Sequence, residues 1–232
     1  MTDLGWRLAT VVDIRTETSD AKSYRLALPE PVDHLAGQHV VVRLTAPDGY
    51  TAQRSYSIAS AADGSNELEL TVERLEGGEV SSYLHDVAEP GDVLEVRGPI
   101  GRWFVWDGTV PALLVGGGSG VVPLMAMLRL ARQIGQEDLL RVLVSARSPD
   151  DLYYRDEIAG PVTHLVFSRS IPAGFRRGPG RVILDDLAPL VRDNDMAYVC
   201  GSHGFAEAVT GLLAQAALPP ERIRVERFGP SG

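Results

Sequence analysis

The first hundred residues alternate between apolar and polar side chains. In LELTVERL (68–75), Leu68, Leu70 and Val72 share one face of an extended chain, and the polar residues between them share the other. A period of two is typical of a half-buried antiparallel strand. Six such stretches are WRLATVVDIRT (6–16), SYRLALP (23–29), HVVVRLTA (39–46), RSYSIAS (54–60), LELTVERL (68–75) and DVLEVRG (92–98). Short strands at this close spacing predict a small antiparallel β-barrel.

After Gly108, short apolar runs alternate with helix-length segments. The runs are ALLVG (112–116), RVLVSA (141–146), THLVFS (163–168), MAYVCG (196–201) and IRVERF (223–228), and the clearest helices are VVPLMAMLRLARQIG (121–135) and HGFAEAVTGLLAQAAL (203–218). This alternation predicts a doubly wound α/β domain, with helices on both faces of a parallel sheet. We therefore predict a six-stranded antiparallel β-barrel domain at 1–107 and the α/β domain at 108–232.

One uncharged stretch, 108–128, has the length of a membrane span. It contains two prolines and the glycine-rich run 116–120, and these breakers favour a strand, a turn and a helix instead. The N-terminus also lacks the apolar segment of a signal peptide. We therefore expect a cytoplasmic protein without a membrane span.

The composition narrows the possible classes of function. The chain is 44% hydrophobic and 23% charged, as in globular proteins, and its net charge of −9 argues against a nucleic-acid-binding surface. Its one cysteine, Cys200, excludes an internal disulfide and a four-thiolate iron–sulfur cluster. The five histidines form no helical ligand pair, so we expect no metal site.

The run GGGSG (116–120) lies between the first strand of the α/β domain and its helix. Backbone amides at such a helix start can hold a diphosphate, whereas a turn that serves packing alone is the alternative. The motif departs from the usual dinucleotide pattern in two ways: Pro123 ends it, and the second strand leads into Arg147 rather than an acid. An arginine there favours a phosphate on the ribose.

Four segments in this order resemble the ferredoxin–NADP reductase superfamily over nearly the whole chain: RSYS (54–57), GGEVSSYL (77–84), GPIGRWF (98–104) and GGGSG-x-x-P (116–123). The resemblance implies a flavin-binding barrel followed by a nicotinamide-nucleotide-binding domain. Arg54 would pair with a flavin phosphate, Tyr56 would pack on the isoalloxazine, and Ser57 would hydrogen-bond near its N5. The residues expected at the flavin are Arg54, Ser55, Tyr56, Ser57, Gly78, Glu79, Val80, Ser81 and Phe228.

In GGEVSSYL, a glycine would let backbone amides approach the flavin diphosphate at the start of a helix. A helix capped by Ser81 or Ser82 would explain the same segment, and the two interpretations are compatible.

The resemblance places the hydride-transfer centre at Ser57, Cys200 and Glu226. YVCGS (198–202) matches the strand end where family members have a cysteine beside the nicotinamide, although a purely packing role for Cys200 is the alternative. VERFGPSG (225–232) resembles the closing acid-x-aromatic stretch, in which Phe228 would cover the flavin ring. Because the tail continues to Gly232, Phe228 would be either a displaceable gate or a fixed wall.

Ser168 and Arg169, after the third strand of the α/β domain, resemble the 2′-phosphate site of NADPH-using members. Arg176 and Arg177 are either further phosphate donors or part of a solvated basic loop. The residues expected at the nucleotide are Gly118, Ser119, Gly120, Arg147, Ser168, Arg169, Cys200, Gly201 and Ser202.

We therefore predict a flavoprotein that takes hydride from NADPH onto bound FAD and passes single electrons to a protein acceptor, a ferredoxin or an oxygenase or other metalloenzyme partner. FMN is the alternative flavin and NADH the alternative reductant. Three other functions stay open: a free-flavin reductase, an electron-transfer subunit of a larger redox complex using NADH, and a flavin-binding regulatory module without turnover.

Overall fold

The computed structural model describes residues 5–193 and 195–229. The chain divides into two units between Val105 and Trp106, two residues before the boundary expected from the sequence.

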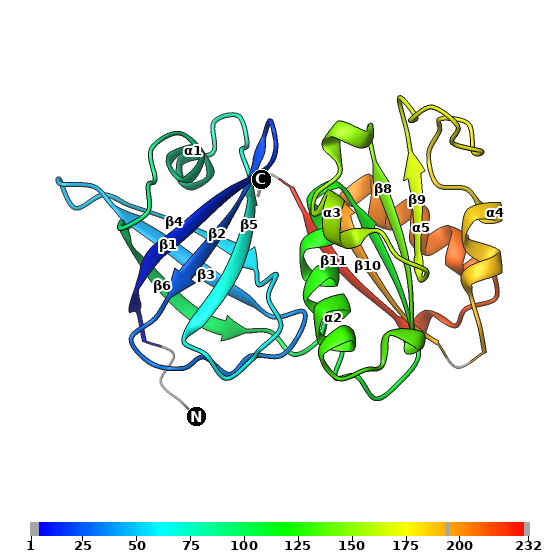
Figure 1. Cartoon of the computed structure of the whole chain (residues 1–232), viewed down its shortest axis with the longest axis horizontal. Coiled ribbons are helices and arrows are strands. Elements are labelled where there is room, and N and C mark those ends of the chain that lie inside the picture. Colours follow the sequence, from blue (N-terminus) through cyan, green and yellow to red (C-terminus); the bar gives the residue numbers. More distant parts are fainter. Residues whose placement is uncertain (1–4, 194, 230–232) are drawn as a thin grey trace. The chain divides into compact units, whose positions relative to one another are not determined.

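The first unit is the predicted six-stranded antiparallel domain (Figure 1). Its elements are β1 (Arg7–Thr18), β2 (Ala21–Ala27), β3 (His39–Thr45), β4 (Thr51–Ser57), β5 (Glu67–Glu73), α1 (Glu79–Asp86) and β6 (Val93–Ile100). The strands follow the order β4-β3-β6-β1-β2-β5, and a bridge between Ile58 and Leu70 joins the two edges of the sheet. This confirms the fold that the period of two predicts.

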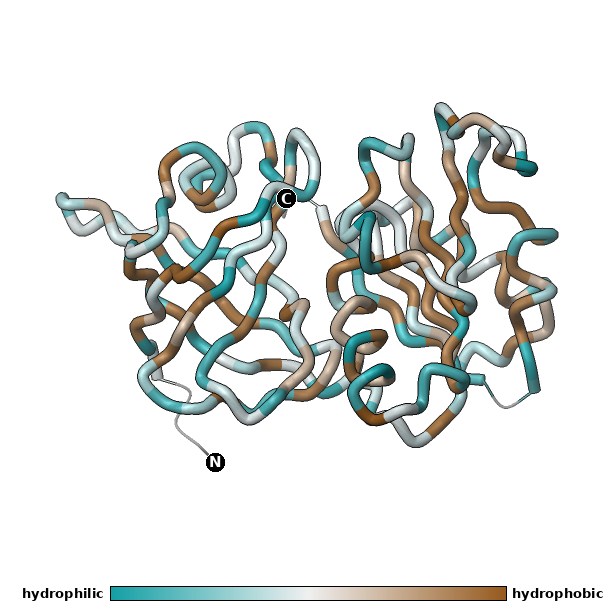
Figure 2. The backbone as a smooth tube through the Cα atoms, in the orientation of Figure 1, coloured by the Kyte–Doolittle hydropathy of each residue, from teal (hydrophilic) through white to brown (hydrophobic). Residues whose placement is uncertain are grey.

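The alternation of side chains builds the core of this unit. Leu68, Leu70 and Val72 are buried on one face of β5, together with Leu26 of β2 and Val96 of β6. In Figure 2, hydrophobic stretches run along the strands of each unit, while hydrophilic residues gather in the connections.

The second unit is the predicted α/β domain. Its strands and main helices are β7 (Ala112–Gly117), α2 (Val121–Gln133), β8 (Leu140–Ala146), β9 (Thr163–Phe167), β10 (Met196–Ser202), α5 (His203–Gln215) and β11 (Ile223–Phe228). The short helical segments are η1 (Gly118–Gly120), η2 (Glu137–Leu139), η3 (Pro149–Asp151), α3 (Arg155–Ile158), α4 (Leu184–Leu187), η4 (Ala188–Leu190) and η5 (Pro220–Arg222).

The order β11-β10-β7-β8-β9 is that of a doubly wound sheet, and all its pairs are parallel. From β7 the chain steps to β8, and from β10 it steps the opposite way to β11, so right-handed crossovers put α2 and α5 on opposite faces (Figure 1). The change of direction falls between β7 and β10, where such sheets bind ligands at their carboxyl ends.

The uncharged stretch 108–128 forms β7, the glycine turn and most of α2, as predicted. Within the described ranges, no helix combines the length and hydropathy needed to cross a membrane.

Candidate cofactor-binding sites

Strand β4 carries Arg54 and Tyr56 on one face. They pair with Val42 and Val40 of β3, whose side chains lie in the core, so Arg54 and Tyr56 point to the same side of the sheet. Tyr56 packs against the core, whereas Arg54 is exposed and donates a hydrogen bond of 2.7 Å to the carbonyl of Gln53. The strand therefore presents a half-buried ring and an accessible cation on the same face.

Two buried hydroxyl groups of β4 have no hydrogen-bond partner among the described residues. They are the Tyr56 hydroxyl and the Ser57 Oγ, and Ser57 is only 4% exposed. Burial raises the pKa of the Tyr56 hydroxyl, which therefore stays protonated and able to donate. Because an unsatisfied buried polar group costs about 1–3 kcal/mol, a polar ligand that bonds these two hydroxyls would be favoured.

Helix α1 offers backbone amides next to β4, against which it packs. Its cap is Gly78, so the prediction that Ser81 or Ser82 caps it is wrong. The Ser81 Oγ instead accepts from the Leu75 amide and donates to the Gly78 carbonyl, both at 3.2 Å, and so fixes the turn before the helix. The side chains of Val80 and Ser81 are buried. This segment can therefore offer a phosphate the unpaired amides of a first helical turn.

The carboxylate of Glu79 is engaged within the protein. The Tyr50 hydroxyl lies 3.1 and 3.0 Å from its two oxygens and donates to it. Sequence reasoning missed Tyr50: the Asp-Gly pair before it marks a hairpin, but no local signal links it to Glu79. Glu79 therefore offers its backbone, rather than its charge, to the candidate flavin site.

The glycine turn after β7 serves both packing and access. Gly118 has a left-handed φ of +56°, and a Cβ built there would meet nothing within 4 Å, so its surroundings are open. At Gly120 a Cβ would lie 2.1 Å from the carbonyl oxygen of Cys200. The packing interpretation of this turn therefore holds for Gly120, and ligand binding at the open Gly118 stays a prediction.

The register of β10 and β11 pairs Cys200 with Glu226 and Ser202 with Phe228. Cys200 is fully buried, and burial, followed by the charge of Glu226, raises the pKa of its thiol. Ser202 is exposed and caps α5 by accepting a hydrogen bond of 3.4 Å from the Phe205 amide. The end of the predicted tail, 230–232, lies outside the described residues.

Glu226 is a half-buried acid. Burial raises the pKa of its carboxyl group to about 7, and no hydrogen bond or ion pair within the described ranges holds it ionised. It can therefore take up or release a proton near neutral pH.

The ends of β8 and β9 bring the predicted phosphate-binding residues together. The Arg169 amide donates to the Arg147 carbonyl at 2.8 Å, and the Ser168 amide donates to the Ala146 carbonyl at 2.9 Å. The side chains of Arg147 and Arg169 are exposed. Two cations therefore flank one sheet edge.

Arg177 does not join these cations. Its guanidinium donates to both carboxylate oxygens of Asp186, at 2.6 and 2.7 Å, and to the carbonyls of Gly178 and Arg181. These bonds hold its own loop in place and leave its guanidinium engaged, so of the two alternatives for Arg177 the structure does not favour a phosphate donor. Arg176 beside it is exposed.

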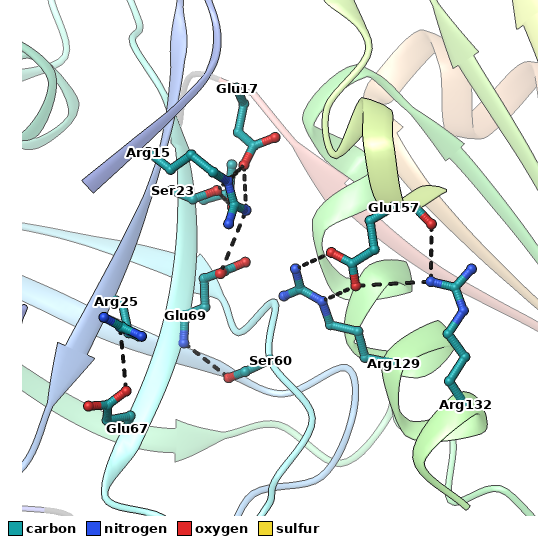
Figure 3. A network of polar contacts seen from close by, with 11 residues as sticks. Arg15, Glu17, Ser23, Arg25, Ser60, Glu67, Glu69, Arg129, Arg132 and Glu157 are labelled. Atoms are coloured by element: carbon teal, nitrogen blue, oxygen red, sulfur yellow. Dashed lines mark hydrogen bonds and ion pairs between the residues drawn. The ribbon is translucent and has the colours of Figure 1, made fainter. Parts of the chain in front are cut away.

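An ion pair braces the helix that follows the glycine turn. Arg129 of α2 donates to both oxygens of Glu157 in α3, at 2.8 and 2.6 Å, and Arg132 donates to the Glu157 carbonyl at 3.0 Å (Figure 3). Helix α2 and the segment after Arg147 are thereby tied together within the second unit.

Two family models match the chain, one to each unit. Residues 8–105 match the oxidoreductase FAD-binding domain, and residues 114–211 match the oxidoreductase NAD-binding domain. Ferredoxin–NADP reductase B of Sorangium cellulosum is 45% identical over 83% of this chain and 84% of its own length. The chain belongs to the ferredoxin–NADP reductase superfamily.

Other members of the superfamily differ in length. A reductase component of the naphthalene 1,2-dioxygenase/salicylate 5-hydroxylase systems of Ralstonia is 30% identical over 96% of this chain and 69% of its own. A flavohemoprotein of Pseudomonas putida is 32% identical over 98% of this chain, which spans 61% of that protein. Among solved structures, a cytochrome P450 reductase from Amycolatopsis has a TM-score of 0.80 at 29% identity, covering 97% of this chain and 70% of its own.

The residues of this superfamily member fit the two cofactors that its domains imply. Tyr56 and Ser57 offer unsatisfied hydroxyls, Arg54 offers a cation, and the first turn of α1 offers amides. In the second unit, the open turn at Gly118 and the exposed arginines 147 and 169 fit a phosphorylated nucleotide.

We expect Glu226→Gln to remove a pH dependence of stability. Because folding raises the carboxyl pKa from 4.5 to about 7, the folded state binds the proton more tightly than the unfolded state. The resulting stabilisation is complete below about pH 4.5 and is lost as the pH rises through about 7. The wild-type free energy of unfolding should therefore fall between pH 5 and pH 8 by on the order of 2 kcal/mol more than that of Glu226→Gln.

Urea unfolding at both pH values measures this difference, with Glu221→Gln, an exposed acid just before β11, as the matched control. If the free energy of unfolding had the same pH dependence in wild type and in Glu226→Gln, burial would not raise the pKa of this carboxyl group.

Proposed function

We propose that this protein takes hydride from NADPH onto bound FAD and delivers single electrons to a protein acceptor. The observation that carries the proposal is the pair of orphaned hydroxyls, Tyr56 and Ser57, on a strand that packs against α1 in an FAD-binding domain. A bound flavin supplies the conversion of one hydride into two single electrons.

The protein's own residues bind and orient the cofactor. Arg54 and the amides at 79–81 would hold the phosphate charge of a bound flavin, the Ser57 Oγ would hydrogen-bond to its ring, and Tyr56 would pack against the ring. The carboxyl group of Glu226, which has no partner among the described residues, would hold or release a proton near pH 7. Gly120 packs on the backbone of Cys200, and the neutral Cys200 thiol leaves the neighbourhood of Glu226 without a second charge.

Three observations support NADPH as the reductant. Arg147 and Arg169 are both exposed and joined through their backbones at one sheet edge, an arrangement that suits the 2′-phosphate of NADPH. No acid ends β8 to hold a free ribose. The Sorangium relative is named for NADP, whereas the Ralstonia relative is named for NAD(P).

The acceptor is proposed to be a ferredoxin or an oxygenase component. The relatives are named as reductases of ferredoxin and of dioxygenase systems. With a single cysteine, these 232 residues cannot build a four-thiolate cluster, so a one-electron centre of that kind must lie outside them.

The visible spectrum of the purified protein tests the proposed function. We expect a yellow protein that bleaches when NADPH is added without oxygen and regains its colour on addition of an oxidised ferredoxin. A colourless protein that reduces added riboflavin would overturn the proposal in favour of a free-flavin reductase. A yellow protein that NADPH and NADH both fail to bleach would favour a regulatory module.

We expect Arg54→Ala to purify largely without flavin while keeping its fold. A hydrogen bond to a charged group contributes roughly 1.5–3 kcal/mol, so flavin affinity should fall by about tenfold or more. The flavin-to-protein absorbance ratio measures the loss. Arg25→Ala, which removes an exposed arginine of the same unit that pairs with Glu67, is the control and should retain flavin. If Arg54→Ala kept its full complement of flavin, Arg54 would face solvent and would not contact the flavin.

We expect Arg169→Ala to lose the preference for NADPH over NADH, mainly through KM. The 2′-phosphate is remote from the transferred hydride and is bound equally in ground and transition states. Losing the contact should cost roughly 1.5–3 kcal/mol in kcat/KM for NADPH and leave NADH kinetics almost unchanged. Arg192→Ala, an exposed arginine before the amino end of β10, is the control. A wild-type preference for NADH would contradict the assignment.

A further inference from the structure

Helix α1 depends on tertiary contacts for its stability and its orientation. It has eight residues, and isolated helices of that length are unstable in water. Val80 and Leu84 anchor one side of it in the core, each 1% exposed. Its direction, which decides where its first-turn amides point, needs contacts at its ends as well.

Two side chains of β2 bind the last carbonyls of α1. The Lys22 ammonium donates to the His85 carbonyl at 2.7 Å, and the Tyr24 hydroxyl donates to the Leu84 carbonyl at 2.6 Å. Lys22 and Tyr24 stand two positions apart, so they share the face of β2 that meets α1. Carbonyls of a last helical turn lack intrahelical partners, and a cation there also complements the helix dipole. The carboxyl end of α1 is thereby attached to the sheet.

The tyrosine contact lies in a dry environment. Tyr24 is 1% exposed, and burial, with a smaller contribution from Tyr56, raises the pKa of its hydroxyl, which stays a donor. Removing that donor would leave the Leu84 carbonyl short of a partner in the core. Because hydrogen bonds are directional, this attachment fixes the orientation of α1, which the apolar contacts of Val80 and Leu84 do not.

We propose that Lys22 and Tyr24 are positioning residues for the flavin phosphate. The inference rests on the proposed function, in which the amino end of α1 receives that phosphate. With its carboxyl end fixed on β2 and its first turn fixed by the Ser81 hydroxyl, α1 can aim its amides in only one direction. Lys22 and Tyr24 act through the helix, so they should affect the phosphate-bearing part of the ligand and spare the ring.

Tyr24→Phe and Lys22→Met test the proposal, and Ser23→Ala is the matched control. Ser23 lies between them on β2, but its hydroxyl lies 2.7 Å from Glu17 and 2.7 Å from Thr71, on the other face of the strand (Figure 3 labels Ser23 beside Glu17). All three variants lose a polar contact of β2, and only two of them lose contact with α1.

The full chain, freed of flavin, is titrated with FAD and with riboflavin, which lacks phosphate, and flavin fluorescence gives each Kd. We expect Kd for FAD to rise roughly three- to tenfold in Tyr24→Phe and Lys22→Met and to stay near the wild-type value in Ser23→Ala. Riboflavin affinity should be the same in all four proteins. Thermal unfolding of each protein shows how much general stability it has lost.

An equal loss of FAD and riboflavin affinity, or an equal loss of FAD affinity in Ser23→Ala, would overturn the positioning role. Unchanged FAD affinity in Tyr24→Phe and Lys22→Met would overturn it as well. If riboflavin binds too weakly to titrate, the comparison with Ser23→Ala decides. A wild-type chain that binds neither flavin would instead overturn the proposed function.

Discussion

The arrangement of the second unit depends on one close approach between backbones. Gly120 packs so tightly on Cys200 that any Cβ would lie 2.1 Å from the Cys200 carbonyl oxygen. Only glycine permits this distance, which brings the start of α2 against the end of β10. Cys200 of β10 pairs with Glu226 of β11. The contact between Gly120 and Cys200 therefore also places the glycine turn near Glu226, at the carboxyl end of the sheet.

In the first unit, the candidate ligand site combines two segments that are far apart in the sequence, β4 and the start of α1. Strand β4 supplies a cation and two unsatisfied hydroxyls, and α1 supplies backbone amides. Neither part has enough polar partners for a phosphorylated ring system alone. Their alignment depends on the register of β4 against β3 and on the bonds that attach α1 to β2.

In the second unit, burial rather than ion pairing determines the protonation of Glu226 and Cys200. Glu226 has a raised pKa because it is half buried without a cation, and Cys200 stays a neutral thiol for a related reason. Arg177, in contrast, pairs its guanidinium with Asp186 of α4. The exposed Arg147 and Arg169, with Arg176 in the loop after β9, therefore carry positive charge at this end of the sheet.

The sequence by itself determined the two-part architecture, the eleven strands and the two long helices, because periods of two and of about 3.6 are local consequences of burial. It also marked RSYS and GGGSG, whose residue types follow from local backbone and ligand demands. The cap of α1, the Tyr50–Glu79 contact, the ion pair of Arg177 and the attachment of α1 by Lys22 and Tyr24 were decided by tertiary structure. These contacts depend on which atoms meet across the fold, and a lysine or tyrosine in a strand has no local feature that reveals its distant partner.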